Sequence, residues 1–263
     1  MKNQPDNTND TTPELKAFIF DVDGTLSDTE RDGHRVAFNR AFAEYGMDWH
    51  WSVDTYGELL AVTGGKERMK FYAEKFLAGD EVPVDLEEKI PALHQAKTRH
   101  YTELLSTGAI PLRPGVERLL KEARQHGFRL AIATTTTPEN VTVLLEHTLG
   151  PESIDWFEVI AAGDIVAKKK PAPDIYDYAL KAMKLDADQC IVFEDSENGI
   201  KSSSAADLNT IITINDYTKD HNFNGASIVL DQMGEPEQPF SVISGNACNH
   251  TYLNCDLVIQ LYQ

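Results

Sequence analysis

Short apolar runs recur along the chain, and each ends at a polar residue. The three clearest runs, each with the polar residue that follows it, are residues 17–20 before Asp21, 130–133 before Thr134 and 190–193 before Glu194. Strands that are apolar on both faces are typical of a parallel sheet covered by helices. The pattern therefore predicts three buried strands with polar ends.

Helical stretches separate these strands. Residues 116–126 carry apolar side chains at helical spacing and precede Gly127, while residues 173–183 begin with Pro173. Alternation of strand and helix predicts an α/β protein with a doubly wound, Rossmann-like parallel sheet. Ligands of such sheets bind beyond the carboxyl ends of the strands, which is where the polar residues fall.

A long insertion between the first two strands has a helical pattern. Apolar positions recur at helical spacing in three stretches, residues 36–45, 66–77 and 85–105. We expect a helical cap domain that lies over the strand ends as a lid, with hinges near Gly33 and residues 111–115.

The expected division of the chain has three parts: a disordered leader (1–14), an α/β catalytic core (15–28 and 112–263) and the helical cap (29–111). The first 13 residues are polar, with neither the apolar stretch of a signal peptide nor the Arg-rich character of a transit peptide. The tail after residue 216 is irregular, with weak strand patterns at 227–230 and 255–262.

Charge and cysteine content narrow the partners and the compartment. The chain has 24 Lys and Arg against 42 Asp and Glu, a net charge of −18, which argues against binding nucleic acid or an anionic membrane through the bulk surface. An anionic ligand would need a local cationic pocket. Three cysteines without a secretory signal, and no apolar run near the ~18 residues of a membrane span, predict a cytoplasmic protein.

Asp21 and Asp23 follow the first strand directly. The alternation of a strand would turn both carboxylates to one side, where two negative charges need a cation. An Asp-x-Asp-Gly sequence is also a common turn. In the chemical interpretation a hard cation such as Mg²⁺ neutralises the pair, one carboxylate attacks phosphorus, and the other acts as general acid and base.

Other strand ends supply the remaining groups of such a site. Thr134 and Thr135 offer hydroxyl and N–H donors, Lys170 offers a cation, and Glu194 with Asp195 offers further carboxylates. Singly, a threonine run is usually structural, a lysine run is usually solvated, and the Asp195-Ser196 pair signals only a helix N-cap. Together they predict one phosphoryl site, because a transferred phosphoryl group needs fixed donors and cations around it.

In this order, these residues resemble the four motifs of the haloacid-dehalogenase-like phosphohydrolase superfamily. The resemblance implies that Asp21 is the nucleophile, that Asp23 is the acid and base, and that Thr134 and Lys170 bind phosphate. It further implies an Mg²⁺ site formed by Asp21, Asp23, Glu194 and Asp195.

Longer strings resemble the CbbY-type branch of this superfamily, known as a xylulose-1,5-bisphosphate phosphatase. They include residues 28–30, 63–68, 131–136, 160–164 and 169–176. The resemblance implies that Glu30 binds sugar hydroxyls. It places the distal part of the substrate against Gly64, Gly65, Lys66, Glu67, Arg68, His94 and Lys97, and the transferred phosphate against Thr134, Thr135, Thr136, Asn140 and Lys170. Asp28, Gln95 and Thr137, together with the longer polar tail, depart from the branch's pattern.

The string at residues 63–68, in the expected cap, also has a physical interpretation that does not depend on the resemblance. Gly64 and Gly65 let backbone N–H groups approach an anion closely, and Lys66 and Arg68 add two cations to an acidic protein. A glycine turn that opens a helix with solvated charges would give the same string. Among the cap histidines, only His94 is favoured as a ligand, and that rests on the resemblance.

The leading hypothesis is an Mg²⁺-dependent sugar-phosphate phosphatase that works through an aspartyl-phosphate, on a pentulose bisphosphate such as xylulose-1,5-bisphosphate. We expect a monomer whose partner is a small phosphorylated sugar. The alternatives are a phosphosugar mutase of the β-phosphoglucomutase type and a non-catalytic phosphosugar-binding regulator.

Overall fold

The computed structural model describes residues 14–62, 64–79 and 81–263. The predicted disorder of residues 1–13 and the Thr63 position of the cap string therefore lie outside the described residues. Within the described ranges, no helix is both long enough and apolar enough to cross a membrane.

A single sheet forms the centre of the core. Its seven described strands lie in the order β3-β2-β1-β4-β5-β6-β7, and every neighbouring pair is parallel except β6 and β7. The strands are β1 (Ala17–Phe20), β2 (Arg129–Ala133), β3 (Phe157–Ala161), β4 (Cys190–Glu194), β5 (Asn209–Thr213), β6 (Ile228–Leu230) and β7 (Val242–Ser244). The predicted α/β doubly wound fold is confirmed.

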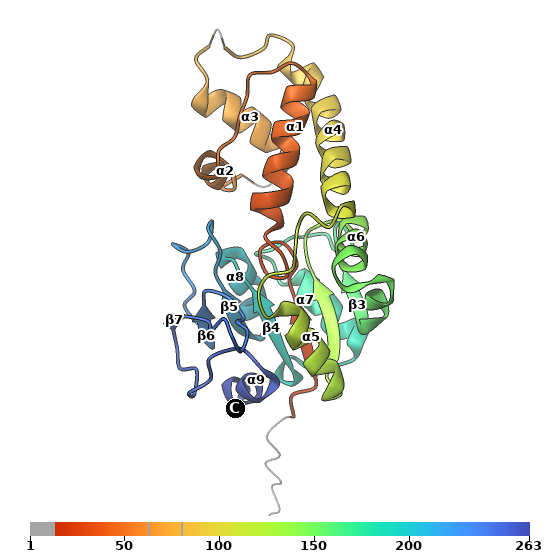
Figure 1. Cartoon of the computed structure of the whole chain (residues 1–263), viewed down its shortest axis with the longest axis vertical. Helices are drawn as coiled ribbons and strands as arrows, with labels where there is room; N and C mark the ends of the chain where they lie inside the picture. Colours follow the sequence, from red (N-terminus) through yellow and green to blue (C-terminus); the bar gives the residue numbers. More distant parts are fainter. Residues whose placement is uncertain (1–13, 63, 80) are drawn as a thin grey trace, which may run out of the picture.

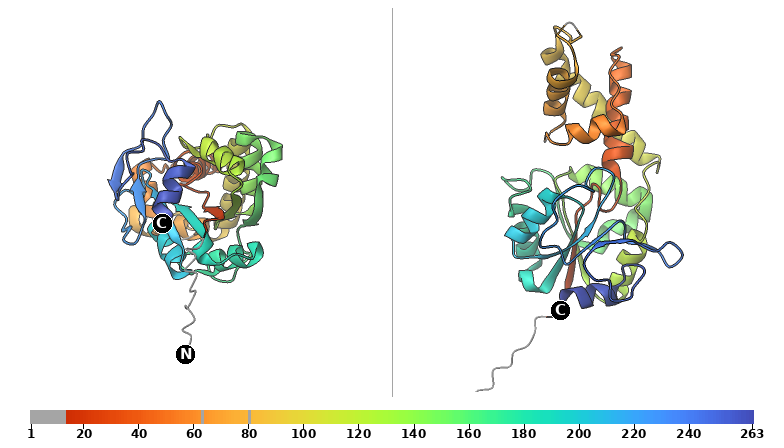
Figure 2. Two further views of the ribbon diagram at one scale, coloured as in Figure 1. Left: turned by 90° about the horizontal axis from the view of Figure 1, so that it is seen from below. Right: turned by 90° about the vertical axis from the view of Figure 1, so that its left-hand side faces the viewer.

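Helices cover both faces of the sheet. The side chains of β1 alternate between two apolar clusters, one on each face. Phe18 and Phe20 pack in the cluster that includes buried side chains of α5, α6 and α9, whereas Ala17 and Ile19 pack with α7. These core helices are α5 (Val116–Gln125), α6 (Pro138–Leu149), α7 (Asp174–Met183), α8 (Glu197–Ala205) and α9 (Cys255–Tyr262), with 3₁₀ turns at Pro151–Trp156 and Ala187–Gln189. Figures 1 and 2 show them around the sheet.

The inserted helices stand beyond the carboxyl ends of the strands, at the opposite end of the molecule from α9 (Figures 1 and 2). A π-helical turn (Thr29–His34) leads into them, and they are α1 (Arg35–Glu44), α2 (Val53–Leu59), α3 (Gly65–Phe76) and α4 (Leu86–Ser106). They enclose an apolar cluster of their own, with Phe38, Phe42, Trp51 and Tyr56 at its centre. Ala37 of α1 and Tyr101 of α4 belong instead to the cluster of the core.

The tail differs from expectation at residues 255–262, which form helix α9 and not a strand. The Asn254 side chain caps this helix by accepting a hydrogen bond from the Leu257 N–H, and Leu257 and Val258 are buried against the core cluster. A short apolar run fits a buried helix as well as a strand, so only its packing partner decides. The weak strand expected at 227–230 is confirmed as β6.

Candidate active site

Asp21 occupies the centre of the site because β1 lies between β2 and β4 in the sheet. The backbone N–H of Asp21 donates to the Phe193 carbonyl at 3.0 Å, which continues the β1–β4 ladder to the strand end. Thr134 directly follows β2 and Glu194 is the last residue of β4, so both lie at this edge of the sheet. Strand β1 is also where the strand order reverses, and such a switch point is where α/β sheets bind ligands.

Lys170 joins two carboxylates of the site. Its ammonium group donates to Asp21 Oδ1 at 2.7 Å, Glu194 Oε1 at 2.5 Å and the Ala133 carbonyl at 2.9 Å. Burial alone would lower the pKa of Lys170, but Asp21 and Glu194 raise it above its ordinary value. Lys170 is therefore a fixed positive charge beside Asp21.

Three buried carboxylates, from Asp21, Glu194 and Asp195, have oxygens within 4.8 Å of one another. Burial raises the pKa of Asp21 to about 7, with Lys170 opposing the shift and Glu194 adding to it. Burial and Glu194 also raise the pKa of Asp195. Hard oxygen donors crowded in this way fit a divalent cation of the Mg²⁺ or Ca²⁺ type, which would relieve their repulsion.

The carboxylates of this cluster are not equally available to bind a cation. Glu194 already accepts from Lys170, from the Tyr176 hydroxyl at 2.7 Å and from the Asp195 N–H at 3.1 Å. The Asp195 carboxylate accepts a hydrogen bond from the Asn215 amide at 2.6 Å. Asp195 thus keeps more of its oxygen capacity for a cation, while Glu194 chiefly anchors Lys170.

Asp23 lies beside this cluster but outside the group of three. Its carboxylate accepts a hydrogen bond from the Thr29 hydroxyl at 2.5 Å. Burial and the nearby charge of Glu30 raise the pKa of Asp23 to about 6, although hydrogen bonds from Thr29 and Thr136 oppose the shift. A carboxyl group with this pKa suits general acid and base chemistry near neutral pH. A side-chain contact from Asp23 to the metal stays a prediction.

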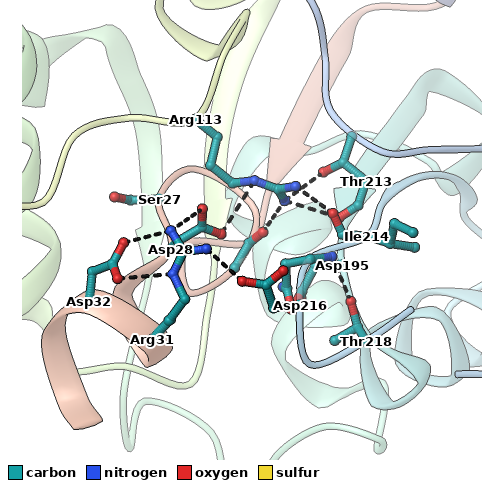
Figure 3. A network of polar contacts seen from close by, with 12 residues as sticks. Ser27, Asp28, Arg31, Asp32, Arg113, Asp195, Thr213, Ile214, Asp216 and Thr218 are labelled. Carbon is teal, nitrogen blue, oxygen red and sulfur yellow. Dashed lines mark hydrogen bonds and ion pairs between the residues drawn. The ribbon is translucent and has the colours of Figure 1, made fainter. Parts of the chain in front are cut away.

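Arg113 holds the loop after β1 in place (Figure 3). Its buried guanidinium donates to the backbone carbonyls of Gly24, Thr213, Ile214 and Asp231, and it pairs with Asp28 Oδ1 at 3.5 Å. The Thr213 and Asp231 bonds measure 3.1 and 2.9 Å. The Arg113 side chain therefore links the loop after β1 to the ends of β5 and β6.

Within the inserted residues 29–111, Glu30, Tyr56 and Arg68 form a closed hydrogen-bonded group. The Tyr56 hydroxyl donates to Glu30 Oε2 at 2.5 Å, and Arg68 Nη1 donates to Tyr56 at 2.7 Å and to Glu30 at 3.4 Å. Burial would raise the pKa of Glu30, but Arg68 and His34 lower it to about 2. Glu30 is therefore ionised and fixed.

The remaining residues predicted in the cap differ in their exposure, and Lys97 lies near enough to Asp23 to lower the pKa of that carboxyl group. Lys66 and Glu67 are exposed, and the Glu67 carboxylate lies close to Gly64. His94 packs against Gly65. The Lys97 ammonium contacts His34 Nδ1 at 2.8 Å, and burial lowers the pKa of Lys97 to about 8.

The predicted phosphate-binding residues after β2 form a hydrogen-bonded chain. Thr134 is buried and its hydroxyl accepts from the Thr136 N–H at 3.4 Å, while the Asn140 amide donates to the Thr136 hydroxyl at 3.2 Å. Thr135 is exposed. The Thr134 hydroxyl therefore organises the loop, and Thr135 has the accessible side chain.

A cleft of about 530 Å³ collects groups from both parts of the molecule. Of the residues predicted from sequence, its lining contains Asp21, Asp23, Glu30, Arg68, Thr135, Lys170, Glu194 and Asp195. Among the described residues, the lining does not include Gly64, Gly65, Lys66, Glu67, His94, Lys97, Thr134, Thr136 or Asn140. Lys169 and Lys201 add cations, as an anionic ligand in an acidic protein requires.

Sequence reasoning missed Tyr56, Tyr176, Asn215 and Arg113. Asn215 could have been found, because it is the second residue after β5, at the same edge of the sheet as Asp21. The other three stand in segments where a tyrosine or an arginine carries no signal by itself.

The fold and the carboxylate site define a hydrolase of the haloacid-dehalogenase type, and the chain belongs to this family. Residues 15–207 match the family of haloacid dehalogenase-like hydrolases. The predicted class, a phosphoric monoester hydrolase, is confirmed.

Within this family the chain belongs to the CbbY-type branch. It is 50% identical over 213 residues to protein CbbY of Rhodobacter capsulatus, covering 81% of this chain and 91% of that protein. It is 45% identical over 225 residues to protein CbbY (plasmid) of Cupriavidus necator, covering 86% and 88%. A crystal structure of a CbbY variant from Rhodobacter sphaeroides with xylulose-1,5-bisphosphate is 43% identical, with a TM-score of 0.72 over 83% of this chain and 94% of that one.

Proposed function

We propose that the protein is an Mg²⁺-dependent sugar-phosphate phosphatase that forms an aspartyl-phosphate on Asp21, with a pentulose bisphosphate such as xylulose-1,5-bisphosphate as substrate. One observation carries the proposal. Asp21, held by Lys170 inside a buried carboxylate cluster, lines the same cleft as Glu30 and Arg68 of the cap. A small anionic sugar fits between two such groups of residues.

The proposed chemistry begins at an oxygen of Asp21. This oxygen attacks phosphorus, and the bond from phosphorus to the sugar oxygen breaks as Asp23 gives that oxygen a proton. Asp23 then takes a proton from water, which attacks phosphorus and releases phosphate from Asp21. Lys170 holds Asp21 in place and offsets negative charge at the phosphoryl group.

Mg²⁺ would be held by Asp21 and Asp195, with Glu194 in the same cluster. The chemistry that a bound Mg²⁺ supplies is neutralisation of the carboxylates and of the phosphoryl oxygens. The donor set supports a hard cation, since all three groups are carboxylates.

The sugar specificity rests on the cap and on similarity. A CbbY structure at 43% identity holds xylulose-1,5-bisphosphate, and Glu30 and Arg68 line the cleft of this chain. Ionised Glu30 is an acceptor for sugar hydroxyls, and Arg68 is a cation for the second phosphate.

The division into core and cap, the monomeric state and the cytoplasmic location are part of the proposal. A bridge between Ser27 and Leu112 brings together the chain segments on either side of residues 29–111, which supports the division. The described cysteines Cys190, Cys248 and Cys255 are free, which supports a reducing compartment.

The decisive experiment compares the wild-type protein with Asp21→Asn on xylulose-1,5-bisphosphate and an aryl phosphate, in Mg²⁺, by release of inorganic phosphate. We expect kcat to fall by at least about 10⁴-fold, because an amide cannot take the place of the nucleophile. The isosteric variant should keep the circular dichroism spectrum of the wild type. Asp54→Asn, on the surface of α2, is the matched control.

Two further arms separate the alternatives. Removal of Mg²⁺ with EDTA should abolish phosphate release, and added Mg²⁺ should restore it. Isomerised sugar phosphate without release of phosphate would favour the mutase, and binding without turnover would favour the regulator. Full activity of Asp21→Asn would contradict the assignment of Asp21 as the nucleophile.

A further inference from the structure

The loop after β5 connects the core with the cap through Tyr217. The Tyr217 ring lies 5.9 Å from the Tyr56 ring, between centroids, and packs against the apolar cluster of the cap. A Cβ atom added at Gly57 would lie 3.1 Å from Tyr217 Cδ1, so the ring fits closely against α2. Tyr217 is thus a core residue whose surroundings belong to the cap.

Hydrogen bonds fix the position of this loop relative to the carboxylate cluster. The Asn215 amide donates to Asp195 Oδ2 at 2.6 Å, and the Tyr217 N–H donates to Asn215 Oδ1 at 2.9 Å. The Asn215 N–H donates to the Thr218 hydroxyl at 3.0 Å. Asp216 pairs with Arg31 of the π-helical turn at 2.5 Å. The Asn215 side chain therefore links the backbone of Tyr217 to the carboxylate of Asp195.

The Tyr217 hydroxyl is buried and has no hydrogen-bond partner among the described residues. Buried polar groups in native proteins are nearly always paired, so an exception asks for an explanation. Burial raises the pKa of Tyr217 to about 12, and the hydroxyl therefore keeps its proton and can donate. Its residue lines the cleft together with Glu30, Arg68 and Asn215.

We propose that Tyr217 is a specificity-determining residue whose hydroxyl hydrogen-bonds the sugar portion of the substrate. Tyr56 would be a poor substitute for this role, because its own hydroxyl is already committed to Glu30 and Arg68. Tyr217 offers a free donor on a ring that is already in place, so binding would order few groups. The assignment rests on the proposed phosphatase function. It adds Tyr217, which comes from the core, to Glu30 and Arg68 of the cap as residues that bind the sugar phosphate.

The test is Tyr217→Phe, which removes one oxygen and keeps the ring. We expect KM for xylulose-1,5-bisphosphate to rise about tenfold, the effect of one lost hydrogen bond. KM for an aryl phosphate should rise much less, because that substrate has no sugar hydroxyls. The melting temperature should not fall, since the hydroxyl that is removed has no partner in the free protein.

Tyr45→Phe is the matched control, because Tyr45 is an exposed tyrosine at the end of α1. An unchanged KM for the bisphosphate in Tyr217→Phe, or an equal rise on both substrates, would overturn the assignment while leaving the phosphatase intact. If the wild-type protein hydrolyses no sugar phosphate at all, the proposed function fails and the assignment fails with it.

Discussion

At two glycines, the carboxylates of the site occupy the space where a side chain would be. A Cβ atom at Gly24, where φ is 88°, would overlap Asp195 and Asn215, and one at Gly199 would overlap the Glu194 carboxylate. Gly199 lies in the first turn of α8, which Ser196 caps by accepting from the Gly199 N–H at 3.1 Å. The close approach of α8 to Glu194 therefore depends on a missing methyl group.

Gly199→Ala tests this close approach. Replacing a helical glycine by alanine normally stabilises a protein by about 1 kcal/mol. Here the methyl group must displace Glu194, so we expect a loss of about 1–3 kcal/mol in the free energy of unfolding. Turnover should fall as well, because Glu194 anchors Lys170. Denaturant unfolding measures the first effect, and the exposed Ser204→Ala in the same helix is the control. Stabilisation would show that Glu194 moves freely.

At the scale of secondary structure elements, Arg113 binds separate segments into one rigid edge. Its guanidinium contacts the loop after β1, the ends of β5 and β6, and Asp28, which precedes the cap. Arg31 extends the contacts by pairing with both Asp28 and Asp216 (Figure 3). The exposed Arg31 pairs contribute little each, so the buried arginine dominates.

Arg113→Met should lower the free energy of unfolding by about 3 kcal/mol, because four carbonyls and Asp28 lose a buried charged partner. Arg124→Met, at an exposed position of helix α5 where the guanidinium lies over the Trp156 ring, should lower stability by less than about 1 kcal/mol. Urea unfolding of the two variants gives the comparison. Equal stability of the two would mean that Arg113 is not a structural anchor.

At the scale of the whole molecule, the cleft lies between a metal-type site in the core and the Glu30–Tyr56–Arg68 group in the cap. Two separated sets of charges suit a substrate with charge at both ends. Binding of the distal group can also favour closure of the cap over the reacting phosphate.

Arg68→Ala tests this reading of the cap. It should reduce kcat/KM for xylulose-1,5-bisphosphate by about 10²-fold, the loss of roughly 2–3 kcal/mol from a charged hydrogen bond. The loss for an aryl phosphate should be much smaller. Lys75→Ala, an exposed position on the same helix α3, is the control. Equal losses on both substrates would mean that Arg68 supports the fold and does not bind the distal phosphate.

The central strands were predictable because a strand buried on both faces is apolar throughout. Residues 17–20 were expected as a strand and form β1. The same local rule left residues 255–262 ambiguous, since α9 becomes a helix through burial against the core cluster. Asn215 was missed because β5 contains two threonines and so lacks the apolar pattern of β1, and no motif drew attention to it.

The sequence by itself determined which residues stand at the ends of the strands, since apolar runs and the polar residues after them are local. It could therefore place Asp21, Thr134 and Glu194 at one edge of a parallel sheet. Only the tertiary structure decided how these groups share their hydrogen bonds. Lys170 bridges Asp21 and Glu194 across 149 and 24 residues of chain, and Tyr217 reaches the cap from the core. Such pairings depend on which surfaces pack together, and that is settled only when the whole chain folds.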